Sequence, residues 1–312
     1  MRLDVLTALL RGGLMMSASY GSALGGKPHR AYVFLALRQA TFGKTIRDAS
    51  CFESIDTMTE MGSACAPITL RALAASVNLP VETCRAVVEL MVARGICTQT
   101  ERGLMATPAA WTDPAVFAAD NASLRSLSEF ADAFERPNGP LADRINDCAA
   151  LARRGFSIER ARLLSPWIDF VLRQLETFIP IVGDGMNAIL MASVASAVFR
   201  RSGLLTGGDF AEGVQNLRDD RGISSNDIAG ISGLPRETVR RRLLQLEASG
   251  FLTRGSDGNW RLNAERALQL SISLPLLDDD SSAGARLMRE LAEAAPPKPD
   301  AVVIFKPRAA AH

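Results

Sequence analysis

Four arginines lie close together in one segment of the chain, at positions 236, 240, 241 and 242. An arginine side chain donates two parallel hydrogen bonds to O6 and N7 of guanine, or pairs with a phosphate. The apolar residues of the same segment recur at helical spacing, which predicts one helix with a buried face: Val239, Leu243 and Leu246. Arg236, Arg240 and Arg241 then share the exposed face, so this helix is a candidate for entering a DNA groove.

The residues just before this helix predict a helix-turn-helix. Ser224 or Ser225 can cap a first helix, and Gly233 permits a tight turn after it. Pro235 opens the second helix, where its missing N–H costs nothing, and Glu237 stands where a capping-box acid would help the first turn. In the second helix Thr238 lies near the exposed tip and Arg242 toward the edge.

A small β-hairpin is predicted after the second helix. Residues 251–254 (FLTR) and 259–262 (NWRL) form its strands around the turn GSDG. Arg254 and Arg261 would lie on this wing, in position for backbone phosphate or the minor groove. Residues 222–263 are therefore predicted to form a winged helix-turn-helix core.

Charge supports this prediction only locally. The formal net charge of the chain is +1, but residues 221–268 hold eight arginines against five acidic residues. A run of arginines is also compatible with a merely solvated face, and some winged helices bind protein, so contact with protein stays open as the alternative to DNA.

The block GLPRETVRRRLLQLEASGFL (233–252) resembles the winged-helix domain of bacterial transcription regulators of the GntR, IclR and MarR types. Their pattern GLPxxTVxRxLxxLExxGFL is nearly reproduced here. The resemblance implies DNA binding, with the base- or phosphate-contacting positions taken by Arg236, Glu237, Thr238, Arg240 and Arg241. It implies no ligand, because no effector domain of those families is recognisable in the chain.

A fainter copy of the segment lies earlier in the chain. Residues 68–98 align without gaps to residues 223–253, with LPVETCR matched to LPRETVR. The apolar helix at 30–42 also has a counterpart at 187–199. Such a repeat predicts a chain built from two related halves.

The first copy keeps the fold pattern but not the basic face. Val81, Ala86 and Val87 stand where the second copy has Arg236, Arg241 and Arg242. Because phosphate neutralisation supplies most non-specific affinity, the first copy should bind DNA more weakly. Its extra apolar surface, from Val81, Val87 and Val88, could serve a protein contact instead. Its candidate DNA-binding residues are Arg71, Glu82, Arg85 and Arg102.

The expected fold is mainly α, with two tandem winged helix-turn-helix domains, additional helices and small β-wings. The N-terminal half is predicted at 1–138, with its core at 68–107, and the C-terminal half at 139–276, with its core at 222–263. The tail at 277–312 is expected to be partly disordered, apart from a short helix at 285–294.

Further local predictions concern the segments outside the two cores. A short helix and then a Gly/Ser-rich loop are expected before residue 28, and a helix at 116–135. The breaker RPNGP separates this helix from a later one at 166–179, which Ser165 would cap with Pro166 as its first residue.

Composition argues against an enzyme or a metal site. The chain has two histidines, His29 and His312, and five cysteines without CxxC spacing. Free buried thiols suit a reducing cytosol, and neither a signal peptide nor a cofactor is expected. The apolar stretch at 179–199 is interrupted by Pro180, Asp184 and Asn187, which favours a buried helix over a membrane span. The 31 Arg to 4 Lys ratio is typical of a bacterial genome rich in G and C.

The expected function is that of a bacterial, cytoplasmic, nucleoid-associated transcription regulator that binds specific sequences of double-stranded DNA. Its C-terminal winged helix is the main reader, so the target site should be asymmetric. The alternatives are a protein-interaction adaptor of the chromosome-segregation type and a plasmid- or phage-type replication initiator. The sequence leaves open a homodimer and a contact with RNA polymerase or another regulatory protein.

Overall fold

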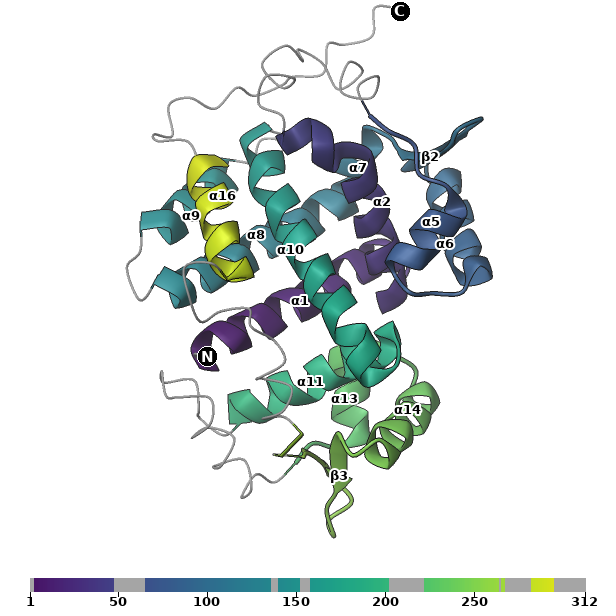
Figure 1. Ribbon diagram of the computed structural model, residues 1–312, viewed down its shortest axis with the longest axis vertical. Helices are drawn as coiled ribbons and strands as arrows, with labels where there is room; N and C mark the ends of the chain where they lie inside the picture. Colours follow the sequence, from purple (N-terminus) through teal and green to yellow (C-terminus); the bar gives the residue numbers. More distant parts are fainter. Residues whose placement is uncertain are drawn as a thin grey trace, which may run out of the picture.

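The computed structural model describes residues 3–47, 65–135, 140–151, 158–201, 222–263, 265–266 and 282–294. The described chain is mainly helical, with two two-stranded antiparallel sheets at the periphery (Figure 1). Residues 136–139 of the predicted breaker RPNGP and the tail after residue 294 lie outside these ranges, and Pro140, the last residue of the breaker, is described.

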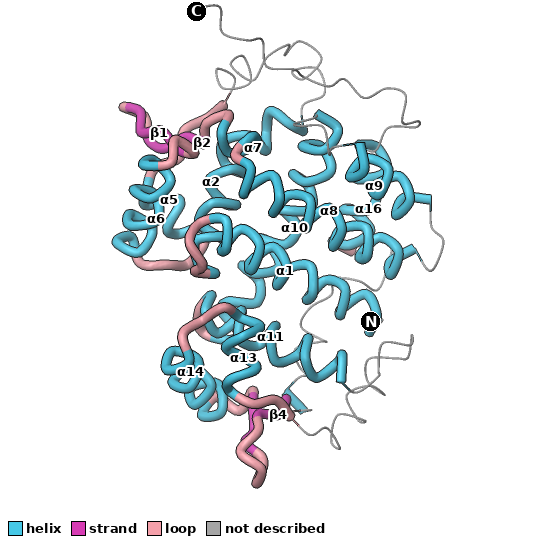
Figure 2. The backbone as a smooth tube through the Cα atoms, turned by 180° about the vertical axis from the view of Figure 1, so that it is seen from behind, coloured by secondary structure: helices cyan, strands magenta, loops and turns pink. Residues whose placement is uncertain are grey.

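Four long helices form the centre of the molecule: α1 (Leu3–Ala23), α2 (Pro28–Arg47), α10 (Ile158–Val182) and α11 (Gly185–Arg201). Helix α1 packs on α2 and on α11, and α10 packs on α11 and on α2. Figure 2 shows α1, α10 and α11 crossing the middle of the molecule.

Two helix boundaries differ from the sequence prediction. Helix α1 continues to Ala23, where a loop was expected, because tertiary packing outweighs the low helix propensity of its small residues. Ser17 and Tyr20 show this packing: both lie where the loop was expected, and their side chains are 2% and 0% exposed. Helix α10 begins at Ile158, so Ser165 does not cap it; the buried Ser165 hydroxyl donates instead to Oε1 of Gln39, 3.0 Å away.

The same order of small elements occurs twice. We call residues 68–106 the N-terminal unit; it contains α5 (Leu70–Ser76), α6 (Val81–Ala93), β1 (Cys97–Thr100) and β2 (Gly103–Ala106). We call residues 223–262 the C-terminal unit; it contains α13 (Ser225–Ser232), α14 (Arg236–Ala248), β3 (Leu252–Arg254) and β4 (Trp260–Leu262). Helix α6 starts at residue 81 and α14 at residue 236, a difference of 155, which equals the offset in the sequence alignment.

The local geometry of the two units also corresponds. Thr69 caps α5 through a bond from the Ala72 amide at 3.2 Å, and Ser224 caps α13 through a bond from the Asp227 amide at 3.1 Å. In the turn that follows, Asn78 and Gly233 occupy equivalent positions with positive φ angles of 49° and 69°. These are residue types that adopt the left-handed conformation most readily.

Each unit packs on one of the central helices. Helix α2 contacts α5, α6 and β2, and α11 makes the equivalent contacts with α13, α14 and β4. The other described helices lie around the centre: α7 (Ala109–Thr112), α8 (Pro114–Glu135), α9 (Pro140–Leu151) and α16 (Ala283–Ala294). Helix α8 packs on α1 and α9, and α16 packs on α10.

Buried apolar residues form two clusters in the described part of the chain. The larger joins α1, α2 and the N-terminal unit to α8, α9, α16 and most of α10. The smaller joins the end of α10 and α11 to the C-terminal unit. The division of the chain near residue 138 stays a prediction.

A test of helix length and hydropathy finds no single described helix suited to crossing a membrane. Residues Glu159–Val182 and Gly185–Ala195, which meet at 100°, satisfy that test only as a bent pair.

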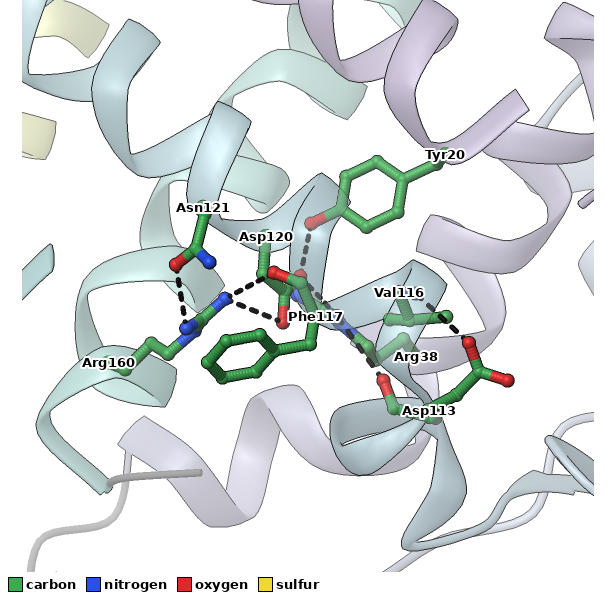
Figure 3. Close-up of polar contacts among 9 residues, drawn as sticks. Tyr20, Arg38, Asp113, Val116, Phe117, Asp120, Asn121 and Arg160 are labelled. Atoms are coloured by element: carbon green, nitrogen blue, oxygen red, sulfur yellow. Dashed lines mark hydrogen bonds and ion pairs between the residues drawn. The ribbon is translucent and has the colours of Figure 1, made fainter. Parts of the chain in front are cut away.

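A buried group of charges lies where α1, α2, α8 and α10 meet (Figure 3). Arg38, Asp120 and Arg160 are each only 1% exposed. Nη1 of Arg38 is 2.8 Å from Oδ1 of Asp120, and Nη2 of Arg160 is 3.7 Å from Oδ2. The Tyr20 hydroxyl also donates to Oδ1 of Asp120.

The two guanidinium groups differ in how their surroundings compensate for burial. Burial alone disfavours the charged form of Arg38, but Asp120 and Tyr20 outweigh it and raise the pKa of Arg38. Burial dominates at Arg160 and lowers the pKa of this residue. The Arg38 guanidinium also lies 4.0 Å from the centre of the Trp111 ring, so ring and carboxylate together hold it between helices.

We predict that Asp120→Asn lowers the free energy of unfolding by about 3–5 kcal/mol, because it leaves two buried cations without a countercharge. Denaturant unfolding measures this. Glu101→Gln, which removes an exposed carboxylate in the β1–β2 turn, serves as the control and should change stability by less than about 0.5 kcal/mol. Equal stability of both variants would show that Asp120 does not hold these helices together.

Candidate nucleic-acid interface

Helix α14 separates a buried face from a charged face. Val239, Leu243 and Leu246 are buried, as their spacing predicts. The charged residues of the first two turns are exposed, apart from Arg242: Arg236, Glu237, Arg240 and Arg241. The helix begins at Arg236, so Pro235 is its N-cap and not its first residue.

Glu237 orients Arg240 on the exposed face. Nε of Arg240 donates to Oε2 of Glu237 at 3.0 Å, and Nη2 donates to Oε1 at 2.7 Å. The hydrogen bond lowers the pKa of Glu237 and raises the pKa of Arg240. Glu237 does not complete a capping box, since Pro235 has no N–H to offer it. Nη1 of Arg240 takes no part in this pair, so it can donate to a further acceptor such as a base edge or a phosphate.

Arg236 and Arg241 flank this pair. Both side chains are exposed, and neither makes a hydrogen bond or ion pair with a residue that the structure describes. They lie on the first two turns of α14, with Thr238 half-buried between them. Two exposed cations beside an oriented third arginine suit the closely spaced acceptors of a DNA groove.

Arg242 has a different role from its neighbours. Its side chain is 21% exposed and turns back toward the junction of α10 and α11. There Nη1 pairs with Asp184 and donates to Oδ1 of Asn187 at 3.3 Å. This arginine therefore attaches α14 to the central helices.

The wing offers a second basic surface. Arg254 is exposed, with its guanidinium carbon 5.7 Å from the centre of the Trp260 ring. Arg261 is half-buried and pairs with Asp257 within the wing, at 2.9 Å and 3.2 Å. The Asn259 amide and Arg261 lower the pKa of Asp257. Arg254 is thus the more accessible of the two predicted wing residues.

The two predicted serines have structural partners. Ser224 caps α13, and the Ser225 hydroxyl accepts a bond from Nε1 of Trp260 at 2.8 Å. That bond holds β4 against the start of α13. Sequence reasoning assigned Trp260 no role, because its partner lies 35 residues away along the chain.

The N-terminal unit repeats the exposed ion pair. Nε of Arg85 lies 3.1 Å from Oε2 of Glu82, and both side chains are exposed. Arg71, on α5, and Arg102, in the β1–β2 turn, are exposed as well.

The apolar surface predicted for α6 is largely absent. Val87 and Val88 are buried, with 2% and 6% exposure, because both belong to the core beneath the helix. Val81 is half-buried. The expectation of an exposed apolar patch at Val81, Val87 and Val88 was therefore wrong for two of its three residues.

The second helix of each unit, α6 in the N-terminal unit and α14 in the C-terminal unit, lies along the same edge of the molecule. Figures 1 and 2, which view opposite sides, both place α6 and α14 at that edge, with a hairpin beside each. The two exposed Glu–Arg pairs thus belong to helices on one edge of the protein.

Potential metal ligands are not clustered among the described residues. These residues contain no group of three or more His, Cys, Asp or Glu side chains placed to hold a metal ion. Cys84, Cys97 and Cys148 are free and buried, and Cys51 lies outside the described residues. Burial raises the pKa of Cys97 and of Cys148 to about 11, so the reactive thiolate form of both is disfavoured.

Comparison with known families agrees with the geometry of the C-terminal unit. Residues 214–253 match a family described as winged helix-turn-helix DNA-binding. Searches of curated proteins and of solved structures found no match. The matched range includes α13, α14 and the start of β3, so the C-terminal unit contains a winged helix-turn-helix DNA-binding domain.

We predict that the neighbours Arg241 and Arg242 respond differently to substitution. Arg242→Ala should destabilise the protein, with a coupling of about 0.5–1 kcal/mol to Asp184→Ala in a double-mutant cycle. Arg241→Ala should leave stability within about 0.5 kcal/mol of the parent. Thermal unfolding of all variants supplies both values, and zero coupling would rule out the contact with Asp184.

Proposed function

We propose that the protein is a bacterial transcription regulator that binds specific sequences of double-stranded DNA, with the C-terminal unit as its main reader. The observation that carries this proposal is the exposed triad Arg236, Arg240 and Arg241 on the first two turns of α14. The buried face of this helix and Arg242 fix its position, so the triad is presented on a rigid element. The family match at 214–253 supports the same function.

We further propose that the N-terminal unit is a second winged helix-turn-helix that arose by duplication. The equal offset of the two long unit helices, the matching caps and the positive φ at Asn78 and Gly233 support it. So does the recurrence of the Glu–Arg pair on α6 and α14.

The two units differ in charge where DNA would lie. The exposed residues on the first two turns of α14 are three arginines and one glutamate, a net charge of +2. On the first two turns of α6 the exposed charged residues are one arginine and one glutamate, a net charge of zero. Since each neutralised phosphate releases counterions, the C-terminal unit should supply most of the salt-dependent affinity.

We predict that Arg240→Ala combined with Arg241→Ala lowers affinity for the preferred duplex by at least about 30-fold, because two base or phosphate contacts are lost. The dependence of log affinity on log salt should weaken by about one for each phosphate contact removed. Fluorescence anisotropy at several salt concentrations, on a duplex selected with the parent protein, measures both.

The matched control removes two arginines that belong to neither unit. Arg11→Ala with Arg125→Ala changes exposed residues on α1 and α8 and should leave affinity and salt dependence unchanged. Unchanged binding in the α14 variant would show that α14 is not the recognition helix. A parent protein that binds no duplex but copurifies with a stable protein partner would favour the adaptor function, and binding confined to repeated origin sites would favour a replication initiator.

A further inference from the structure

The central helices contact one another reciprocally. Helix α1 precedes α2, on which the N-terminal unit is mounted, and α10 precedes α11, on which the C-terminal unit is mounted. Helix α1 packs on α11, and α10 packs on α2. In each half, the helix that precedes the one supporting its unit therefore packs on the supporting helix of the other half.

The turns of the two units show the same reciprocity. Pro28 and Gly185 are the first residues of α2 and α11. A Cβ on Gly185 would lie 3.8 Å from the carbonyl oxygen of Val77, at the end of α5. A Cβ on Gly233, at the end of α13, would lie 3.7 Å from Cγ of Pro28. The turn of each unit thus faces the start of the other unit's mounting helix.

Reciprocal contacts of this kind distinguish rotation from translation. Two copies related by a twofold axis exchange equivalent contacts, whereas copies placed head to tail use two different surfaces. In this chain both the contacts between the central helices and the contacts of the two turns are reciprocal. They indicate an internal twofold axis that passes between the two units.

We propose that one chain binds an inverted repeat in double-stranded DNA, with each unit on one of two unequal half-sites. This inference rests on the proposed function, because it specifies the arrangement of the DNA that the same surfaces would contact. The half-sites share the positions facing Arg85 and Arg240, which are held by equivalent glutamates. They differ where Ala86 replaces Arg241.

We expect the two half-sites to lie about one helical turn of DNA apart. Two recognition helices on one edge of a rigid protein enter successive major grooves on one face of B-DNA, about 10 base pairs apart. Insertion of about 5 base pairs turns one half-site to the opposite face and removes the contribution of one unit.

The test begins with selection of preferred duplexes from random DNA by the full chain. Affinity is then measured for the selected site, for the same half-sites in direct orientation, for a single half-site, and for the selected site with 5 added base pairs. We expect the inverted arrangement to bind at least about 10-fold tighter than the other three, with one chain per duplex. Equal affinity for all four, a preference for the direct arrangement, or two chains per inverted site would overturn the twofold assignment while leaving DNA binding intact. Failure to select or bind any duplex would remove the proposed function as well.

A designed variant tests the same assignment independently. Ala86→Arg introduces an arginine at the position equivalent to Arg241, so it should bind a perfectly symmetric repeat of the C-terminal half-site roughly 10-fold tighter than the parent does. Ala93→Arg adds the same charge to the exposed end of α6 and is the matched control, with no preference for the symmetric site. Equal behaviour of the two variants would contradict equivalent placement of α6 and α14.

Discussion

The buried carboxylate of Asp120 is the interaction on which the arrangement of the central helices depends. It is the countercharge for Arg38 on α2 and Arg160 on α10, and it accepts the Tyr20 hydroxyl of α1. A buried guanidinium without a countercharge would be costly, so Asp120 stabilises the packing of these helices. Since α2 and α11 support the two units, and α10 joins them, the distance between α6 and α14 follows from this packing.

Comparison of the two units separates the positions that maintain the fold from those that determine the charge of the exposed surface. The cap, the left-handed residue of the turn and the Glu–Arg pair recur in both. On the first two turns of the long helix, three of the differences change the charge: Val81, Ala86 and Val87 correspond to arginines. Val87 and the equivalent Arg242 make different contacts. Val87 is buried in the core, whereas Arg242 forms an ion pair with Asp184. Divergence at the first two positions alters the exposed surface without requiring a change of fold.

Local patterns predicted the C-terminal unit well, because periodicity, caps and turn residues act over a few positions. The spacing of Val239, Leu243 and Leu246 placed the buried face of α14 correctly. The roles of Arg242 and Asp120 could not be predicted in this way. Arg242 meets Asp184 58 residues away, and Arg38 meets Asp120 82 residues away, so neither pair leaves a local pattern. The same reason explains the length of α1: Tyr20 lies in the stretch expected to be a loop, and its partner Asp120 is 100 residues away.

The central claim is that one chain presents two related helices to one face of DNA, with the greater affinity under the C-terminal unit. Hydroxyl-radical footprinting of a single chain on its selected site tests this most directly. The account predicts two protected patches on one face of the duplex, about 10 base pairs apart, with the stronger protection lost first in Arg240→Ala. One continuous patch under α14 alone, or protection that does not respond to Arg240→Ala, would contradict it.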